Sequence, residues 1–459
     1  MSNEQEIRLE RFLRLFTDVR RGEGCTALLL MFDLFIVLTA YLVIKTVREP
    51  LILVGGGAEV KSYAAAGQAL LLLLVIPLYG WLASKVNRIK LINWVTLFFI
   101  SNLIAFYVMA RFHVPIGVIF FLWVGIFNLL VVAQFWSLAN DLYTREQGQR
   151  LFAIVAFGGS LGAIVGPIAA AWMFRPLGPY QLMLVAAVLL AISMFIANRV
   201  HAREKRAVHG KEKSEDDPEK PLGEEGGFRL VFGQRYLLWI ALLMVVANLI
   251  NTTGEFILGK KVTEEARRAV ATNHQHGGAI SVATNDAAAQ MERTAQSFVG
   301  EFYGNFFFWV NLSGAVIQLF FVSRIIKYLG VPGALFFLPA IALGSYSLIA
   351  AAPMLSYIRF GKILENSTDY SLQNTTRQSL FLPTSREAKY KAKAAIDTFF
   401  VRLGDVLSAA LVFIGSSLLL NPESFALINV ALVILSFLLV SVIGRHYRML
   451  TQRELETAR

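Results

Sequence analysis

RVHAREKRAVHGKEKSEDDPEKPLGEEGGFR, residues 199–229, divides this chain into two strongly apolar halves. The stretch has mixed charge and almost no aliphatic side chains, which is typical of a flexible linker that buries no core. The whole chain of 459 residues is 56% hydrophobic and only 16% charged, well below the charged share of a soluble protein. Apolar runs of about 20 residues, long enough to cross a bilayer, recur on both sides of the linker. The sequence therefore predicts an all-α polytopic membrane protein.

Twelve apolar runs predict 12 transmembrane helices in two six-helix halves. The predicted spans are 26–54, 63–84, 91–111, 115–142, 150–174, 178–198, 236–259, 299–324, 332–351, 354–377, 391–419 and 423–444. Basic loops follow the even-numbered spans, so the positive-inside rule places both termini in the cytoplasm. Around the halves, 26–198 and 236–444, we expect an amphipathic surface segment over 1–25, a linker over 199–235, an extracytoplasmic loop over 260–298 and a tail over 445–459.

Three pairs of similar sequence features, in the same order in both halves, indicate that the halves are pseudo-symmetric. They pair span 4 with span 10 and span 5 with span 11, as two parallel six-helix repeats require. The paired features are SLAND (137–141) with SLQNT (371–375), the basic loops 145–150 with 386–391, and Leu161-Gly162 with Leu403-Gly404.

Several classes of function are not expected from this sequence. The net charge of +11 resides in loops and the linker, as membrane topology demands, so we expect no nucleic-acid partner. Cys25 is the only cysteine, which rules out an intrachain disulfide. No Walker loop, nucleophile elbow or paired-cysteine motif is present, so we expect neither an enzyme nor a cofactor. His274 and His276 have a metal-like spacing without a nearby acid, and we interpret them as solvated loop residues rather than a metal site.

Three ionisable residues interrupt span 1 in YLVIKTVREPLIL, residues 41–53. Lys45, Arg48 and Glu49 are spaced i, i+3, i+4 and share a helix face. Because an ionised side chain in mid-bilayer costs about 2.5–3.5 kcal/mol, such groups face a cavity or a partner. Pro50 can break or kink the helix there, while the LILV that follows indicates that the span continues outward. Two interpretations are open: an anion-receiving cluster, or a snorkelling helix end with an internal Arg–Glu pair.

Spans 7 and 10 carry further polar residues. Span 7 places Asn251 and Glu255 on one face, where they either meet a substrate or hydrogen bond between helices. In span 10, Glu365, Asp369 and Gln373 step by four along one stripe. The candidate substrate-binding residues are Lys45, Arg48, Glu49, Asn251, Glu255, Lys362, Asp369, Tyr370, Asn374 and Arg377.

A second set of residues is expected to control gating or coupling. Asn140 and Asp141 end span 4 beside a basic loop, which favours a cytoplasmic gate or cap. Asp397 and Arg402 in span 11 form either a gate pair or a static ion pair. The full set is Asp33, Asn140, Asp141, Asp397 and Arg402.

Four stretches resemble one family. They are YLVIKTVREPLIL (41–53), FWSLANDLYTREQGQRLFAIVAFGGSLGAIVG (135–166), DYSLQNTTRQSLFLP (369–383) and KAKAAIDTFFVRLG (391–404). In this order they are similar to the nucleotide transporters (ATP/ADP translocases) of plastids and obligate intracellular bacteria. The resemblance implies a major facilitator fold and exchange of nucleotides, typically ATP for ADP with phosphate.

The resemblance also implies roles for single residues. Lys45 and Arg48 match the family's basic residues of span 1, and Glu49 the acid that follows. Glu255 matches the acid of span 7, and Arg377 a lysine near the end of span 10. The sequence departs from the family where Asp369 stands for a lysine, Gln373 or Asn374 for an aspartate and Gln378 for a glutamate, and where 112–140 contains no acid.

The leading hypothesis is a secondary transporter of an anionic, phosphorylated metabolite such as ATP or ADP. It would work by alternating access, as a monomer in the bilayer of a bacterial inner membrane. The alternatives are a proton-coupled facilitator for another organic solute and a non-transporting membrane scaffold or sensor.

Overall fold

The computed structural model describes residues 19–20, 23–143, 145–207, 227–276, 284–385 and 387–457. Its contacts divide the chain into two compact units. The first comprises the described residues within 1–55, 72–216 and 269–308, and the second those within 56–71, 217–268 and 309–459. The predicted surface helix over 1–25 falls mainly outside the described residues, as do residues 208–226 of the linker. The predicted boundaries of the two halves stay a prediction.

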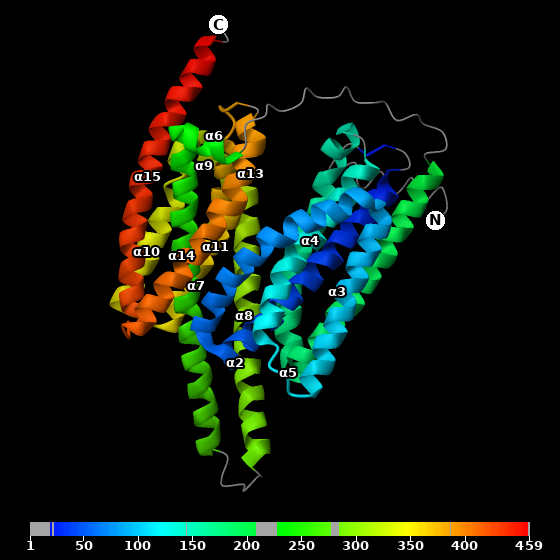
Figure 1. Cartoon of the computed structure of the whole chain (residues 1–459), viewed down its shortest axis with the longest axis vertical. Helices are drawn as coiled ribbons and strands as arrows, with labels where there is room; N and C mark the ends of the chain where they lie inside the picture. The colour runs from blue at the N-terminus through cyan, green and yellow to red at the C-terminus, as the bar shows by residue number, and fades with distance from the viewer. Residues whose placement is uncertain are drawn as a thin grey trace. The chain divides into compact units, whose positions relative to one another are not determined.

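The described residues are helical, without a β-strand among them (Figure 1). Before residue 208 the helices are α2 (Gly24–Lys85), α3 (Arg88–Arg111), α4 (Gly117–Leu142) and α5 (Arg145–Ala207). After residue 226 they are α6 (Gly227–Gly233), α7 (Arg235–His276), α8 (Thr284–Phe320), α9 (Val322–Ala334), α10 (Phe337–Ala351), α11 (Leu355–Thr368), α12 (Asn374–Ser379), α13 (Lys393–Ala395), α14 (Val401–Ser417) and α15 (Pro422–Thr457). Three π-helical turns interrupt them: η2 (Asp369–Gln373), η3 (Ala388–Ala392) and η4 (Ile396–Phe400).

Two of these helices are each a pair of spans joined at a glycine. Gly57 in α2 and Gly178 in α5 have φ angles of 80° and 76°, a region that favours a residue without a Cβ. The expected continuation of span 1 past Pro50 is confirmed. The helix continues through Pro50, which membrane helices tolerate, and the chain turns at Gly57 instead.

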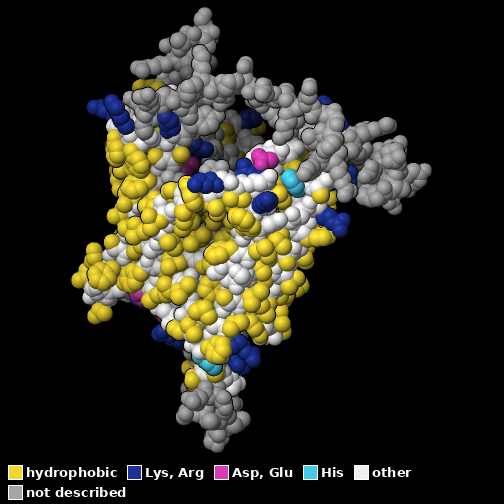
Figure 2. Space-filling model, turned by 45° about the vertical axis from the view of Figure 1, so that its right-hand side comes forward, with side chains coloured by type: hydrophobic (Ala, Val, Ile, Leu, Met, Phe, Trp, Pro, Cys, Tyr) yellow, Lys and Arg dark blue, Asp and Glu magenta, His cyan; other side chains and the backbone are white. Residues whose placement is uncertain are grey.

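Twelve spans result within the described residues. Counting α2 and α5 twice and α3 and α4 once gives six spans before residue 208. The remaining six are α7, α8 with α9 as far as its turn at Gly330 (φ 70°), the rest of α9 with α10, α11 with η2 and α12, η3 through α14, and α15. Seven of the helices are long and apolar enough to cross a membrane as they stand, and α8 with α9 passes the same test as a pair bent by 76°. Figure 2 shows hydrophobic side chains over a broad band of the visible surface, with Lys and Arg mostly above and below it. The protein is thus a multi-pass membrane protein.

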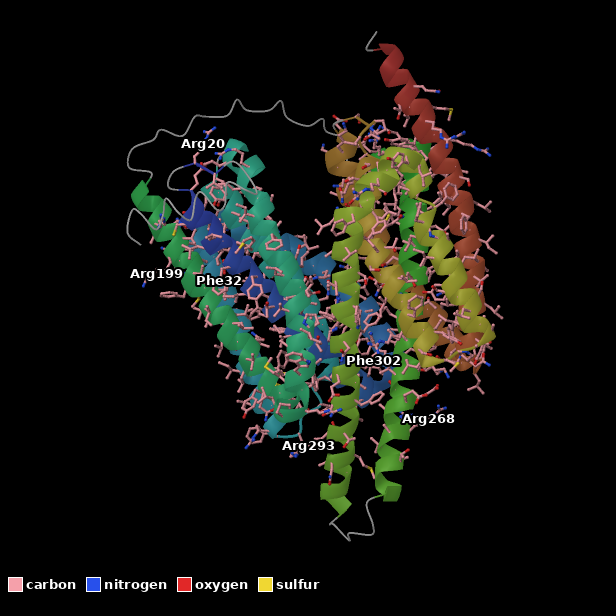
Figure 3. All side chains as sticks on the ribbon, turned by 180° about the vertical axis from the view of Figure 1, so that it is seen from behind. Arg20, Phe32, Arg199, Arg268, Arg293 and Phe302 are labelled. Carbon is pink, nitrogen blue, oxygen red and sulfur yellow. The ribbon has the colours of Figure 1, made fainter. Side chains whose placement is uncertain are left out.

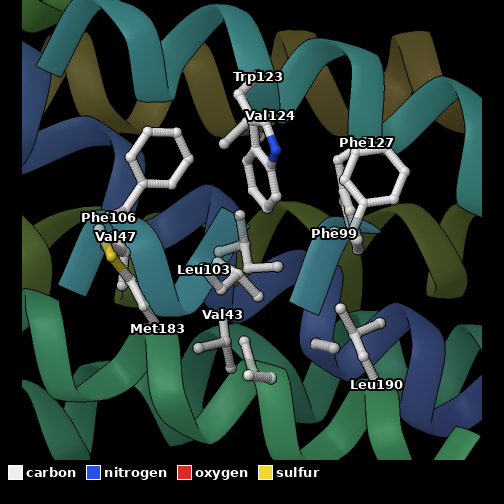
Figure 4. Close-up of a cluster of buried hydrophobic side chains, with 14 of the residues drawn as sticks. Val43, Val47, Phe99, Leu103, Phe106, Trp123, Val124, Phe127, Met183 and Leu190 are labelled. Atoms are coloured by element: carbon white, nitrogen blue, oxygen red, sulfur yellow. The ribbon is translucent and has the colours of Figure 1, made fainter. Parts of the chain in front are cut away.

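An aromatic core holds the first unit together. Phe99 of α3 packs edge-to-face against Trp123 and Phe127 of α4, with ring centroids 5.4 and 5.0 Å apart. Aliphatic side chains of spans 1 and 6, among them Val43 and Leu190, complete the cluster (Figure 4). This packing fixes span 1, and with it the cations that span 1 carries.

The repeat seen in the sequence has a packing counterpart in each unit. Gly162 of α5 lies so close to the backbone oxygen of Phe35 in span 1 that a Cβ there would overlap it. Gly404 of α14 lies in the same way against span 7, where a Cβ would come within 2.8 Å of the Val245 oxygen. Small residues of this kind let membrane helices approach closely. Span 5 therefore packs on span 1 as span 11 packs on span 7.

The predicted extracytoplasmic loop is largely helical in its described parts. α7 continues to His276 and α8 begins at Thr284, and the exposed Arg268 and Arg293 mark the two extensions (Figure 3). The reason lies in the spacing of the charges. Lys261 pairs with Glu264 at 2.9 Å and Arg268 with Glu265 at 2.8 Å, i,i+3 pairs that stabilise a helix in water. The C-terminal tail is likewise a continuation of α15 as far as Thr457.

Candidate substrate site

The two cations of span 1 lie over aromatic rings. Lys45 Nζ is 4.4 Å from the ring centroid of Phe307 in α8, and the Arg48 guanidinium is 4.5 Å from that of Phe121 in α4. Both distances are those of cation–π contacts, which hold a charge without neutralising it. The cations are one helical turn apart in the first unit and form a small basic site.

Glu49 compensates only one of them. Arg48 donates from Nε to Glu49 Oε1 at 3.1 Å and from Nη2 to the same oxygen, and the Glu49 side chain is fully buried. Lys45 has no carboxylate oxygen within 4.0 Å among the described residues. The internal Arg–Glu pair considered from the sequence is present, and the neighbouring Lys45 still carries an uncompensated charge.

A denser network of charges fills the second unit. Lys362 of α11 is 1% exposed. Its ammonium donates to Asn251 Oδ1 at 2.8 Å and lies 3.2 Å from Glu365 Oε2 and 3.8 Å from Glu255 Oε1. The structure thus brings together three of the predicted site residues, Lys362, Asn251 and Glu255. In this conformation Lys362 is enclosed by protein groups.

Glu255 links this network to the start of span 2. Its Oε2 lies 3.7 Å from Lys61 Nζ, and its Oε1 accepts a hydrogen bond from Asn366 Nδ2 at 3.1 Å. A second ion pair joins the same two segments, between Lys260 Nζ and Glu59 Oε1 at 3.4 Å. The stretch after Gly57 is therefore attached to α7 by two ion pairs.

Tyr346 closes the network from α10. Its hydroxyl donates to Glu365 Oε2 at 2.9 Å, and the side chain is completely buried. The ring reaches this place because residue 254 of α7 is glycine, where a Cβ would overlap the Tyr346 hydroxyl. Gly254 also leaves room for Lys362 Nζ, which a Cβ would approach to 3.1 Å. A close approach of three helices thus places the charges.

A π-helical turn separates the remaining span 10 residues from this network. η2 begins at Asp369, so residues beyond it no longer continue the faces of α11. Tyr370 and Asn374 are exposed, and Asn374 accepts a hydrogen bond from Arg377 at 3.1 Å. The predicted stripe with a step of four does not persist, because Glu365 and Gln373 are buried while Asp369 between them is half-buried.

Arg402 has a different partner from the predicted one. It donates to Asp405 Oδ2 at 3.2 Å, and Asp405 also accepts from Asn248 at 2.8 Å and Thr252 at 2.9 Å. The pairing of Arg402 with Asp397 is not seen. A spacing of five residues places two side chains on different faces of an α-helix, whereas i,i+3 brings them together. The Asp397 Oδ1 is buried without a hydrogen-bond partner among the described residues.

Two ion pairs lie beside loops of the first unit that the sequence predicts to be cytoplasmic. Asp141 accepts from Arg88 at 2.9 Å, and the preceding Asn140 is exposed. Arg150 pairs with Glu23 instead, through two hydrogen bonds of 3.0 Å. Burial raises the pKa of Glu23, but hydrogen bonds from Arg150, the Arg20 backbone and Gln147 outweigh it and leave this pKa lowered.

Asp33 is a buried acid of span 1. It is 2% exposed, and Ser193 of α5 donates to its Oδ1 at 2.6 Å. No lysine, arginine or histidine nitrogen lies within 4.0 Å of this carboxyl group among the described residues.

Sequence reasoning missed four members of the second network: Tyr346, Lys61, Glu365 and Asn366. Tyr346 sits in an apolar run without a charge nearby, so no pattern marked it. Lys61 was placed in a loop before span 2, although a lysine in GGGAEVKSYAAAG at the edge of an apolar run is a signal of its own. Glu365 was recognised as polar but was not counted among the site residues.

Solved structures with the same arrangement of helices are membrane transporters. A bacterial homologue of the iron transporter ferroportin, in an inward-facing state, is 12% identical with a TM-score of 0.64, over 91% of this chain and 98% of that one. The nucleoside transporter NupG gives 12% identity and a TM-score of 0.56, with coverages of 91% and 98%. At these identities the likeness establishes the fold alone. This likeness confirms the predicted major facilitator fold.

Sequence comparison then supplies the family. Residues 116–451 match the family described as TLC ATP/ADP transporter. The chain therefore belongs to the TLC ATP/ADP transporter family. Among its relatives, ADP,ATP carrier protein 1 of Chlamydia trachomatis is 23% identical over 318 residues, 60% of this chain and 54% of the relative, so this match spans about half of the relative's length. ADP,ATP carrier protein 3 of Rickettsia typhi is 21% identical, over 89% of this chain and 91% of the relative.

Proposed function

We propose that this protein is a secondary transporter that exchanges nucleotides such as ATP and ADP across a bacterial inner membrane, with both termini in the cytoplasm. The observation that carries the proposal is Lys45, whose charge no carboxylate compensates among the described residues, one turn from Arg48 in the same span. Ionisable residues inside membrane spans mark substrate or ion pathways, and a cation there suits an anionic substrate. Family membership supports the choice of a nucleotide as that ligand.

The chemistry of the site suits a phosphate chain. Arg48 offers a planar fork of donors and Lys45 a compact positive charge, which are the two usual phosphate-binding groups. The Phe307 and Phe121 rings hold both cations in place. Because no carboxylate oxygen lies within 4.0 Å of Lys45 Nζ among the described residues, an incoming phosphate can bind this ammonium group.

Counterflow in proteoliposomes tests this function. We expect Lys45→Gln and Arg48→Ala to abolish uptake of labelled ADP into vesicles loaded with ATP. Lys85→Gln is the matched control, because Lys85 lies at the end of α2 over Trp81, away from the span interior. Size-exclusion chromatography verifies that each variant is folded. Counterflow that is unchanged in both site variants would contradict the proposal.

A second candidate is a proton-coupled facilitator, which the isolated burial of Asp33 favours. In that case Asp33→Asn abolishes uptake driven by a pH gradient and spares counterflow, which needs no net proton movement. Uptake that is insensitive to pH and to ionophores would remove this candidate.

A further inference from the structure

The lysines that surround the carboxylate of Glu255 in α7 lie farther from it than an ion pair with hydrogen bonds requires. Three donors from two helices, Lys61 from α2 and Lys362 and Asn366 from α11, converge on its two oxygens at 3.7, 3.8 and 3.1 Å. Charge-assisted hydrogen bonds between an ammonium and a carboxylate are normally about 2.7–2.9 Å long. Both lysines are therefore nearly an ångström too far from Glu255, although each faces one of its oxygens.

A phosphate group matches this arrangement better than a carboxylate does. It carries three terminal oxygens at the corners of a tetrahedron and up to two negative charges, so it fills more space and attracts two lysines more strongly. Asn366 supplies a neutral donor to the same point. Two ammonium groups and one amide are a sufficient set of donors for one phosphate.

Lys362 stays compensated when the Glu255 side chain moves away. Lys362 keeps Glu365 at 3.2 Å, and Glu365 keeps the hydroxyl of Tyr346 at 2.9 Å. Lys61 would be left without Glu255, and the arriving anion takes over that role. In this exchange one anion replaces another. The folded protein already keeps the two lysines away from water, so binding of the phosphate does not add their desolvation cost.

A phosphate group can reach these donors from the side on which Glu255 lies. Its side chain is 23% exposed, against 11% for Lys61 and 1% for Lys362. The backbone beneath it is held, because Gly254 lies against Tyr346 and the neighbouring Phe256 is buried on Phe425. Glu255 can therefore leave by rotating its side chain while α7 stays in place.

We propose that Lys61, Lys362 and Asn366 form a phosphate-binding subsite, which Glu255 occupies as an internal anion until a phosphate group of the substrate displaces it. Lys61 thereby becomes a substrate-binding residue. The identity of the ligand as a phosphorylated substrate rests on the proposed function, whereas the subsite itself rests on the geometry.

Binding to the purified full chain tests the subsite, with inorganic pyrophosphate and ADP as probes in calorimetric titrations. Glu255→Gln keeps the shape of the side chain and removes its charge, so the affinity for both probes should rise roughly tenfold. Lys61→Gln should lower the affinity by a similar factor of about ten, and Lys61→Arg should restore most of it. Lys260→Gln is the control, because Lys260 pairs with Glu59 and not with Glu255. Its affinity should match that of the wild type.

The outcomes separate the two proposals. Weaker binding by Glu255→Gln, or equal losses in Lys61→Gln and Lys260→Gln, would overturn the subsite even where ADP counterflow persists. Pyrophosphate binding with the expected pattern, in a protein that exchanges no nucleotide, would leave the subsite standing and reject the nucleotide function. A wild-type protein that binds neither probe rejects both. Thermal unfolding curves for each variant distinguish lost binding from lost folding.

Discussion

Lys362 Nζ lies 3.2 Å from Glu365 Oε2, one turn further along α11, and both side chains are almost completely buried. The pair is enclosed by Tyr346 of α10 and Asn251 of α7, which bind the remaining donor and acceptor positions. A buried ion pair gains little net stability over apolar side chains, because desolvation offsets the attraction. Its use lies in holding charges at fixed positions inside a membrane protein.

Removing one partner of this pair should destabilise the protein more than removing both. Lys362→Met leaves Glu365 buried with less compensation, and we expect a loss of about 3–5 kcal/mol in the free energy of unfolding. The double variant Lys362→Met with Glu365→Leu should regain much of that loss. Thermal unfolding of the purified variants in detergent measures both. A double variant less stable than Lys362→Met would show that the pair stabilises the fold.

A methyl group at residue 254 should disrupt the same network. In Gly254→Ala the new Cβ overlaps the Tyr346 hydroxyl, so α7 and α10 must separate or Tyr346 must leave Glu365. Overpacking of this kind costs about 1–3 kcal/mol, and we expect a lower melting temperature together with reduced transport. Gly344→Ala in α10 is the control, because a Cβ there meets nothing within 4 Å. Equal effects of the two substitutions would contradict this account.

The pair of Arg150 and Glu23 should make stability depend on pH. Since the pKa of Glu23 is lowered below its usual 4.5, the charged form is favoured in the folded state, and the stabilisation is present above about pH 4.5. It is lost as the pH falls further, through the folded-state pKa. Melting temperatures between pH 7 and pH 3.5 should therefore fall more steeply for the wild type than for Glu23→Gln. Parallel curves would show that this carboxylate does not contribute.

Arg402 should be coupled energetically to Asp405 and not to Asp397. We expect a double-mutant cycle of Arg402→Gln with Asp405→Asn to give a coupling energy of up to about 1 kcal/mol, the range for a partly exposed pair. The cycle with Asp397→Asn should give a value near zero, since Asp397 and Arg402 do not touch. Unfolding free energies of the single and double variants supply both values. Coupling to Asp397 instead would indicate a second conformation in which the predicted gate pair forms.

Most of the architecture could be predicted because membrane spans are a local property of the sequence. A run of about 20 apolar residues is a span whatever it packs against, and the charged linker separates the spans into six and six. The Leu-Gly echo even anticipated a contact, since Gly162 and Gly404 each lie on the backbone of another span in their own unit. Local breaks were harder to predict. Pro50 has a strong propensity to bend a soluble helix, yet the chain turns at Gly57, where a positive φ is required.

The same distinction between local sequence properties and helix packing applies to the candidate sites. The sequence by itself determined that cations lie inside spans 1 and 10, because hydropathy and residue order reveal a charge in an apolar run without any knowledge of its surroundings. The packing of the helices then set the partners that are distant in the chain. Lys45 meets the ring of Phe307, and Lys362 of span 10 meets Asn251 and Glu255 of span 7. The pair of Arg48 and Glu49 is local and was among the interpretations of the sequence. The physical reason is that an ion pair requires two side chains within about 4 Å, and for residues far apart in the chain that distance is set by which helix faces pack together.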